Sequence, residues 1–541
     1  MKKISKLVVM SLFVLPLFTS CTDNVSTSTT SVETSQASNG TTSEIADVTT
    51  SEVASEVSSE VQISSPDSIT LENIKPETFS IYSINDTHGA IEEDAESYTY
   101  QPGLVNLDYA IKNDEDFTDY SILLSAGDMS QGSGLSNISK GDCMMESMNA
   151  MGFDAMTIGN HEFDWGVDAI KQMEEKANFP FLGINITNKD DGEIADFSQA
   201  STIIQKGGVK VGVIGSIYKD ISSSISASAI QDIEFTDDAP LVEAEAERLK
   251  VDEECDLVIV ETHQGGGTAA TSAFIESDYI DGVFGGHDHQ FTNTSNSDDS
   301  CYFLEAGSSS RGYAKMTFSL KEDNYEAEGG FWHKVTESES ANATSPLVLA
   351  VINKYLDIVG DVLDEVVGER DDSFTRSNLG TLITEAMMNY ARNTEGGDDI
   401  VVAVHNMGGI RDTWTSETDS DGDGLFDITY DDIYSVMPFD NQVQWIMLTG
   451  TDLIQACKTH YHSKDYEVIG SKYYLNGVEI DRDAEYKVFA IDYIITDYGD
   501  PCYKGIGGGT NLNGDIALTR DIFNNYVQSL GILHIADFPV L

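Results

Sequence analysis

Apolar and polar positions alternate in blocks over residues 76–335. Short apolar runs such as "FSIYSI", "VKVGVIG" and "CDLVIVETH" are separated by longer stretches with helical spacing. Nearly continuous apolar strands that alternate with helices are typical of buried sheets covered by helices. The pattern therefore predicts an α/β domain over residues 76–335.

A single long amphipathic stretch follows this block. Pro346 suits the first turn of a helix, and Val348, Ile352, Tyr355 and Val359 recur after it at helical spacing. We expect a linker helix over residues 346–365 and a second α/β domain over residues 366–541. The whole chain is then α/β (α+β) in class.

The first residues read as a targeting signal. A basic start, "MKKISK", precedes the apolar run "LVVMSLFVLPLF", which is too short for a confident membrane-spanning helix, and Cys21 follows. Residues 1–21 resemble a bacterial lipoprotein signal peptide, in which Cys21 would be lipidated; a plain secretion signal is the alternative. Residues 22–75 are rich in Ser, Thr and Glu and predict a disordered tether. We therefore expect an extracytoplasmic protein, lipid-anchored to the bacterial cell membrane.

The net charge of the chain limits the classes of partner that the protein is expected to bind. The formal net charge is −62, which repels phosphate backbones, so a nucleic-acid polymer is not an expected partner. A small phosphorylated substrate remains compatible, because bound cations can invert the charge of a local site. The cysteines beyond Cys21 are far apart and include no Cys-x-x-Cys pair, which argues against a disulfide framework and against a thiolate metal site.

Five short polar motifs stand at the carboxyl ends of predicted strands, where sites assemble in α/β sheets. Half of the ten histidines fall in them. Imidazole, carboxylate and amide groups in one place suit a pair of divalent metal ions such as Zn or Mn, and two ions can clamp a phosphoryl group during displacement. Each motif alone could be an ordinary loop. The motifs are Asp86-x-His88, Gly127-Asp128, Gly159-Asn160-His161-Glu162, Thr262-His263 and Gly285-Gly286-His287-Asp288-His289.

These motifs, written "NDTHG", "GDMSQG", "GNHEFDWG", "ETHQGG" and "GGHDH", resemble those of the calcineurin-like metallophosphoesterases, specifically the bacterial 5′-nucleotidase/UDP-sugar hydrolase family. In the second domain, "SNLGTLITEAM", "HNMGGIR" and "ITYDDIYSVMPFDNQV" are similar to that family's C-terminal domain. The resemblance covers about residues 76–541. It implies a metallophosphoesterase sandwich of β-sheets flanked by helices, then a 5′-nucleotidase C-terminal domain that binds substrate.

The resemblance also implies roles for individual residues. His161 would be the catalytic histidine, oriented by Asp164, since a carboxylate fixes the tautomer of an imidazole. Asp128 would bridge two metal ions. The ligands implied for one ion are Asp86, His88, Asp128 and His289, and those for the other are Asp128, Asn160, His263 and His287.

In the second domain the resemblance implies substrate contacts at Asn406 and Arg411, and an aromatic clamp on the base that includes Phe439. A tight turn and a core aromatic are the alternatives. The second ring of the clamp departs from the family pattern, because "TDYGDPCYKG" replaces the usual glycine-rich turn. We expect Tyr503 there, with Tyr498 as the alternative.

Arg376 is a further candidate for the substrate pocket, and an exposed salt bridge would explain this arginine equally well.

An acidic insertion, "DSDGDGLFD", precedes "ITYDDI". Asp419, Asp421, Asp423 and Asp427 have the spacing of a calcium loop, with Gly424 at the sharp turn, but Tyr430 stands where an EF-hand has glutamate. A solvated acidic loop is the alternative.

The sequence thus predicts a metal-dependent phosphoric monoester hydrolase, a 5′-nucleotidase, that uses two divalent ions and also a structural calcium. A UDP-sugar hydrolase or a 2′,3′-cyclic-nucleotide phosphodiesterase would fit the same metal site. A calcium-stabilised surface-binding lipoprotein on an inactive enzyme fold is the alternative of another class. We expect a monomer that binds nucleotides and contacts the membrane only through its lipid.

Overall fold

The computed structural model describes residues 75–541, except for 96–98, 227–228, 497–498 and 515. The predicted signal peptide, Cys21, all of the tether but residue 75, and Tyr498 lie outside the described residues. No helix among the described residues is both long enough and apolar enough to span a bilayer.

Two six-stranded sheets form the first domain, in the orders β14-β13-β1-β2-β3-β4 and β11-β12-β10-β9-β7-β6. The strands of the first sheet are β1 Thr78–Ile84, β2 Ile122–Ser125, β3 Ala155–Thr157, β4 Phe181–Leu182, β13 Gly312–Lys321 and β14 Asn324–Lys334. Those of the second are β6 Ser201–Lys206, β7 Val209–Ile217, β9 Leu257–His263, β10 Gly282–Gly285, β11 Phe291–Ser295 and β12 Tyr302–Ala306.

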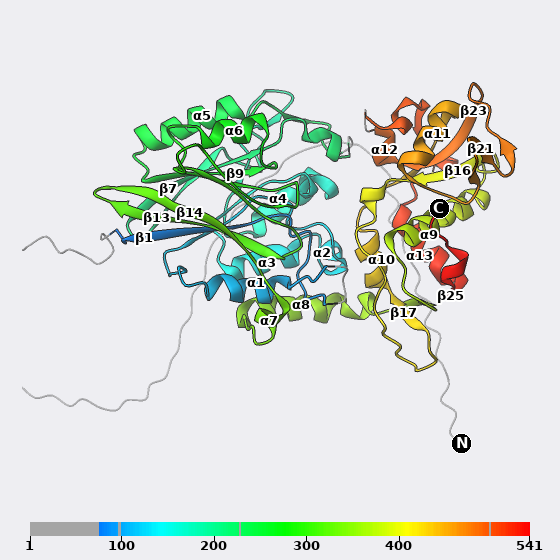
Figure 1. Ribbon diagram of the computed structural model, residues 1–541, viewed down its shortest axis with the longest axis horizontal. Coiled ribbons are helices and arrows are strands. Elements are labelled where there is room, and N and C mark those ends of the chain that lie inside the picture. Colours follow the sequence, from blue (N-terminus) through cyan, green and yellow to red (C-terminus); the bar gives the residue numbers. More distant parts are fainter. Residues whose placement is uncertain (1–74, 96–98, 227–228, 497–498, 515) are drawn as a thin grey trace, which may run out of the picture. The chain divides into compact units, whose positions relative to one another are not determined.

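The two sheets pack face to face through apolar side chains. Ile81 and Leu124 from the first sheet share one buried cluster with Val211 and Ile259 from the second. Helices cover the outer faces: α1 Gly103–Lys112, α3 Asp142–Met151 and α4 Val167–Lys176 lie on one side, and α5 Ala239–Glu247 and α6 Ala269–Ile275 lie on the other (Figure 1). This is the expected sandwich of sheets flanked by helices.

The helix expected to link the domains is α8, Pro346–Leu363. Its buried residues Val348, Ile352 and Tyr355 join the apolar cluster of the first domain, whereas Ile358 and Val362 on its last turns are exposed. The helix is therefore packed into the first domain over most of its length, and the chain enters the second domain at β15, Val366–Arg370.

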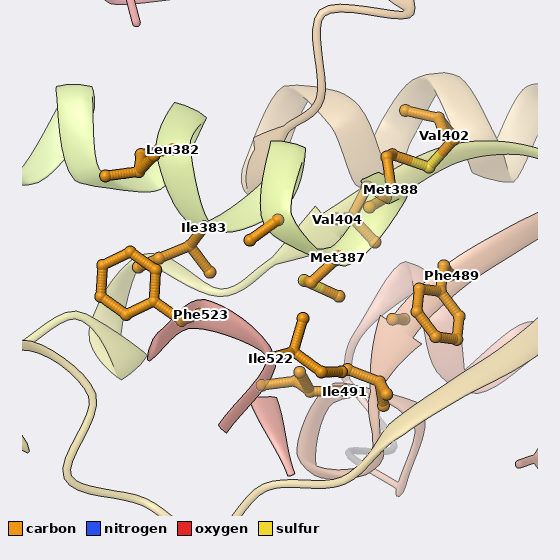
Figure 2. Close-up of a cluster of buried hydrophobic side chains, with 14 of the residues drawn as sticks. Leu382, Ile383, Met387, Met388, Val402, Val404, Phe489, Ile491, Ile522 and Phe523 are labelled. Carbon is orange, nitrogen blue, oxygen red and sulfur yellow. The ribbon is translucent and has the colours of Figure 1, made fainter. Parts of the chain in front are cut away.

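The second domain is built on a five-stranded sheet in the order β19-β16-β23-β18-β24. Figure 2 shows its core, where Ile383 and Met387 of α9 face Val404 of β16, Phe489 of β23 and Phe523 of α13. Its main elements are α9 Arg376–Arg392, β16 Ile400–His405, β17 Phe426–Thr429, α10 Tyr430–Val436, β18 Val443–Thr449, α11 Gly450–Thr459, β23 Glu485–Ile491, α12 Asp492–Thr496, β24 Ile506–Thr510 and α13 Thr519–Leu530.

Candidate active site

The five predicted motifs meet at one edge of the sandwich. Strands β1, β2 and β3 run parallel in one sheet, and β9 and β10 run parallel in the other. The motifs lie at or just after the carboxyl ends of these strands, and His263 is itself the last residue of β9. The structure thereby brings together Asp86, His88, Asp128, Asn160, His161, His263, His287 and His289.

The side chains form two overlapping groups. Ligand atoms of Asp86, His88 and His289 lie within 4.8 Å of one another, as do those of Asp128, His263 and His287. The second group includes a 3.1 Å contact between His263 Nε2 and Asp128 Oδ2. Asn160 belongs with this group, because its Oδ1 lies 3.1 Å from His263 Nε2 and 3.0 Å from His287 Nδ1.

This donor set fits divalent metal ions. The Nε2 atoms of His88 and His289 face each other at 2.9 Å, and Asp86 Oδ1 lies 3.8 Å and 3.4 Å from them. Neutral imidazoles and carboxylates that point their lone pairs at one place match the nitrogen and oxygen ligands of Zn, Mn and similar ions. Among the described groups at this edge, the possible ligands are imidazoles, carboxylates and the Asn160 amide.

The backbone around these residues is held in sparsely populated conformations. Asp86, His88, Asp128, His287 and His289 all have a positive φ, between 49° and 79°. For a residue other than glycine this conformation costs about 1–2 kcal/mol, and such strain concentrates at functional sites. The loop backbones therefore direct these side chains toward one place at a cost in local conformational energy.

Two glycines make room where the loops approach each other. Gly127 has a φ of 90°, and a Cβ on it would lie 2.6 Å from the Gly159 nitrogen. A Cβ on Gly159 would lie 2.2 Å from Asp128 Oδ1. A side chain on Gly159 would displace Asp128, and one on Gly127 would displace the Gly159 backbone, which explains the glycines in both motifs.

Glu162 fastens the same two loops, a role that sequence reasoning missed. Its buried carboxylate accepts hydrogen bonds from the amides of Asp128 at 2.9 Å, Met129 at 2.8 Å and Gly159 at 2.8 Å. Burial, together with the Asp128 carboxylate, raises the pKa of Glu162 to about 7. Its position one residue after His161 is the only sequence signal that could have pointed to it.

His161 stands between the metal-binding groups and the second domain. Its backbone amide donates to Asp128 Oδ1 at 2.8 Å, and its Nδ1 lies 2.8 Å from Asp164 Oδ2. Burial alone would lower the pKa of His161, but the Asp164 and Asp128 carboxylates outweigh it and raise the pKa. On the open side, Arg411 Nη2 lies 3.4 Å from His161 Nε2.

A cavity of about 800 Å³ opens beside His161. Asn406, Arg411 and Phe439, the substrate contacts that the resemblance implies, line it from the second domain. The Phe439 ring lies 5.4 Å from the His161 ring between centroids, and the Arg411 guanidinium lies 5.0 Å from the Phe439 centroid. A substrate group in this cavity would touch both domains.

The other two predicted substrate contacts lie elsewhere. Tyr503 is 45% exposed and is not part of this cavity, which Tyr493 lines instead. Arg376 lines a neighbouring cavity, where its Nη2 donates to the Arg411 carbonyl at 2.6 Å. Tyr493 had no signal in the sequence, because it stands in the apolar run "AIDYII" and not in the loop where the family pattern places a ring.

The loop that carries Phe439 is held from both domains. Buried Arg520 donates to the Pro438 carbonyl at 3.1 Å, pairs with the Asp440 carboxylate and lies 4.1 Å over the Tyr434 ring. From the first domain, Asn137 Nδ2 donates to the same Pro438 carbonyl at 2.7 Å. Neither Arg520 nor Asn137 was singled out from the sequence, since only the folded chain brings them to this loop.

The predicted calcium loop is a turn immediately before β17. Asp419 accepts hydrogen bonds from the amides of Gly422 and Gly424. Glu369 on the neighbouring strand β15 is paired with Asp427, and its carboxylate lies within 4.8 Å of those of Asp421 and Asp423. The Glu369 carboxylate, from outside the loop, thus lies close to the Asp421 and Asp423 carboxylates within it.

Comparison with known proteins agrees with this geometry. Residues 79–291 match the family model of calcineurin-like phosphoesterases, and residues 358–474 match that of the 5′-nucleotidase C-terminal domain. These matches place the protein among the metallophosphoesterases, a class of metal-dependent hydrolases. The chain carries a calcineurin-like phosphoesterase domain and a 5′-nucleotidase C-terminal domain, and the predicted resemblance and fold class are confirmed.

Individual relatives are more distant. The chain is 28% identical to Endonuclease YhcR of Bacillus subtilis, over 79% of this chain and 38% of that protein. It is 25% identical to a 5′-nucleotidase of Vibrio vulnificus, over 62% of this chain and 66% of the relative. It therefore spans less than two thirds of the length of either protein. In structure it is similar to a 5′-nucleotidase precursor from Thermus thermophilus, with a TM-score of 0.70, 19% identity, and coverage of 84% and 97% of the two chains.

Proposed function

We propose that this protein is an extracytoplasmic 5′-nucleotidase that releases phosphate from nucleotides with two divalent metal ions. The observation that carries the proposal is the position of His161. It is bonded through its amide to Asp128 in the metal-binding groups, and it touches Arg411 and Phe439 of the second domain in one cavity.

Asp128 is proposed to serve both ions, since its carboxylate lies close to ligand atoms of both groups. One oxygen lies 3.1 Å from His263 Nε2, and ligand atoms of Asp128 and His88 lie within 4.8 Å of each other. When bound, the pair of ions would supply an activated water and neutralise phosphoryl charge. The proposed ligands are Asp86, His88, Asp128 and His289 for one ion, and Asp128, Asn160, His263 and His287 for the other.

The remaining residues bind and orient the substrate. His161, held by Asp164, can donate a proton to the departing alkoxide or stabilise charge on the phosphoryl oxygens. Arg411 offers a planar fork of N–H donors to an anionic group. Phe439 offers a ring face to the base, and we propose Tyr493 alongside Tyr503 as candidates for the second ring.

Hydrolysis of AMP by the full chain tests the proposal. Purified protein supplied with Zn or Mn should release phosphate from AMP, and Asp128→Ala should lose nearly all turnover together with bound metal. Asp483→Ala, an exposed aspartate outside the site, is the matched control and should change neither. Near-normal turnover and metal content in Asp128→Ala would refute the site.

Export and lipid anchoring at Cys21 are part of the proposal. They are supported by the basic and apolar start of the chain and by 25% identity to a relative named as a cell wall protein of Listeria monocytogenes. Cys21→Ser should move the protein from the membrane fraction to the soluble fraction. Unchanged membrane association would show that Cys21 is not the anchor.

We further propose that Asp419, Asp421, Asp423 and Asp427 hold a structural calcium ion. Glu369 is added to the predicted set because it could supply the carboxylate that Tyr430 lacks. Calcium should raise the melting temperature of the wild type by binding only the folded state. An Asp421→Ala/Asp423→Ala variant should lose this response; a variant that responds to calcium as the wild type does would exclude the loop as the site.

A further inference from the structure

A further group of possible metal ligands lies in the second domain, outside the five motifs. Ligand atoms of His460, Asp500 and Cys502 lie within 4.8 Å of one another. His460 directly follows the last residue of α11, and Cys502 lies in the short helix η6, Pro501–Lys504, which Asp500 caps. Two segments that are distant in sequence thus bring an imidazole, a carboxylate and a thiol together.

The group is buried, and one of its nitrogens lacks a hydrogen bond. The side chains of His460 and Asp500 are 9% and 7% exposed, and Cys502 is fully buried. His460 Nε2 lies 2.7 Å from Asp500 Oδ2, but their alignment is not that of a hydrogen bond. Among the described residues, this nitrogen therefore has no hydrogen-bond partner. A buried polar atom in that state calls for another ligand, and a metal ion would satisfy it.

A simple buried ion pair is the alternative explanation. It requires a protonated imidazole whose N–H points at Asp500, and the hydrogen bond that this would form is not present between the two side chains. It also gives Cys502 no part, although the Cys502 amide donates to Asp500 Oδ1 at 2.7 Å and so holds the thiol beside the carboxylate. A metal ion accounts for all three side chains.

The charges of the group balance those of a divalent cation. Burial, followed by the charge of Asp500, raises the pKa of the Cys502 thiol, so the thiol keeps its proton when no cation is bound. A metal ion would displace that proton, because metals bind the thiolate. One thiolate, one carboxylate and one neutral imidazole then offset two positive charges, and a neutral complex suits a buried position.

Zinc is the ion that fits this mixture of ligands. It accepts thiolate sulfur, imidazole nitrogen and carboxylate oxygen, and it can take three protein ligands with water in the fourth position. Calcium and magnesium prefer oxygen ligands. The thiol of Cys502 therefore favours zinc over either of them.

The same segment departs from the family pattern. In "TDYGDPCYKG", Pro501 and Cys502 stand where the resemblance leads us to expect a glycine and an aromatic residue. The sequence argued against a thiolate metal site because it has no Cys-x-x-Cys pair, but that criterion finds only ligands that are close together in the chain. A mixed set drawn from two distant segments escapes it.

We propose that Cys502, His460 and Asp500 bind a structural zinc ion, which fastens η6 to the end of α11 in the second domain. On binding, the ion takes the place of the thiol proton, which is released to solvent. The site is separate from the proposed hydrolysis and uses none of the ligands assigned to it.

Cobalt gives a readout that is specific to this site. A thiolate bound to Co²⁺ produces a charge-transfer absorption band in the near ultraviolet, whereas the imidazole, carboxylate and amide ligands proposed in the first domain do not. The full chain, treated with EDTA and then supplied with Co²⁺, should show this band, and Zn²⁺ should remove it by competition. A wild type without the band would overturn the proposal.

Substitution of the thiol locates the band. Cys502→Ala should lose it and should bind one zinc ion fewer per chain by elemental analysis. Cys301→Ala, which removes a buried thiol of the first domain, is the matched control and should keep both. A Cys502→Ala variant that keeps the band, or a Cys301→Ala variant that loses it, would show that the thiolate is not that of Cys502.

A milder variant tests the site even if Cys502→Ala does not fold. His460→Gln keeps the thiol, so it should keep the band but need about tenfold or more Co²⁺ to develop it, since even the loss of an outer partner of a ligand weakens metal binding by about 10–100-fold. Wild-type affinity in His460→Gln would contradict the proposed ligand set.

Thermal denaturation tests the structural role. Zinc that binds only the folded chain raises its melting temperature, so Zn²⁺ should raise the melting temperature of Cys502→Ala by less than that of Cys301→Ala. Equal shifts in the two variants would exclude a stabilising zinc ion at Cys502.

Discussion

His161 lies one residue from a proposed metal ligand, yet its ring is directed at Asp164 and Arg411. We therefore expect His161→Asn to keep its metal and to lower kcat for AMP by about 10²–10⁴-fold, the usual range for a general acid–base group. Elemental analysis and steady-state kinetics check both parts. His534→Asn, an exposed histidine in the second domain, should behave as the wild type. Loss of metal in His161→Asn would make this residue a ligand instead.

The proposed metal ligands could be singled out from the sequence because each motif is short and local. Asp86 and His88, for example, need only a strand before them and a turn at Gly89. Glu162 and Arg520 were not predictable, because most of their partners lie in other segments: backbone amides for Glu162, and the Pro438 carbonyl and the Asp440 carboxylate for Arg520. An amide or carbonyl at a distant position leaves no mark in the sequence that would single out the side chain that binds it.

Among the elements, the loop that carries Phe439 has the clearest testable role. Phe439→Ala should raise KM for AMP about tenfold or more, since stacking a base on a ring contributes about 1–3 kcal/mol in single-strand binding proteins. Hydrolysis of p-nitrophenyl phosphate, which has no base, should change little. Equal effects on both substrates would make Phe439 a packing residue.

Three further variants extend this test to residues outside the loop that carries Phe439. Arg520→Met should reproduce the selective KM defect if holding the Pro438 carbonyl and Asp440 positions the ring. Tyr493→Ala and Tyr503→Ala separate the candidates for the second ring. A selective defect only in Tyr503→Ala would favour the position expected from the sequence over the one that lines the cavity.

The strands and helices themselves differed in how readily they could be predicted. The apolar runs of β7 and β9 marked buried strands, and the spacing in α8 marked a helix. The glycine-rich strand β24, "IGGGT", had almost no apolar signal and is a strand because it pairs with β18. The burial of most of α8 in the first domain also depends on contacts made by segments far away in sequence.

At the scale of the whole molecule, carboxylates gather around Asp431. Burial and then the charges of Asp432, Glu92, Asp94 and Asp364 raise the pKa of Asp431 to about 7, whereas an unfolded aspartate titrates near about 4. Between these values the folded chain holds a proton that the unfolded chain lacks, so the free energy of unfolding falls as the pH rises from about 4 to about 7.

Asp431→Asn should remove this fall in the free energy of unfolding, because asparagine does not titrate. The variant should melt at a higher temperature than the wild type at pH 8, with a smaller difference at pH 4.5, as measured by thermal denaturation across that range. Asp483→Asn is the matched control. Parallel curves for Asp431→Asn and the wild type at all pH values would show that Asp431 is not the group that couples stability to pH.

The three hydrogen bonds to Glu162 have a consequence for the exchange of backbone hydrogens with solvent. The amides of Asp128, Met129 and Gly159 belong to two loops that are far apart in sequence, yet one carboxylate accepts from all three. When that carboxylate withdraws, all three lose their acceptor at once. Deuterium should therefore enter both loops in a single correlated step.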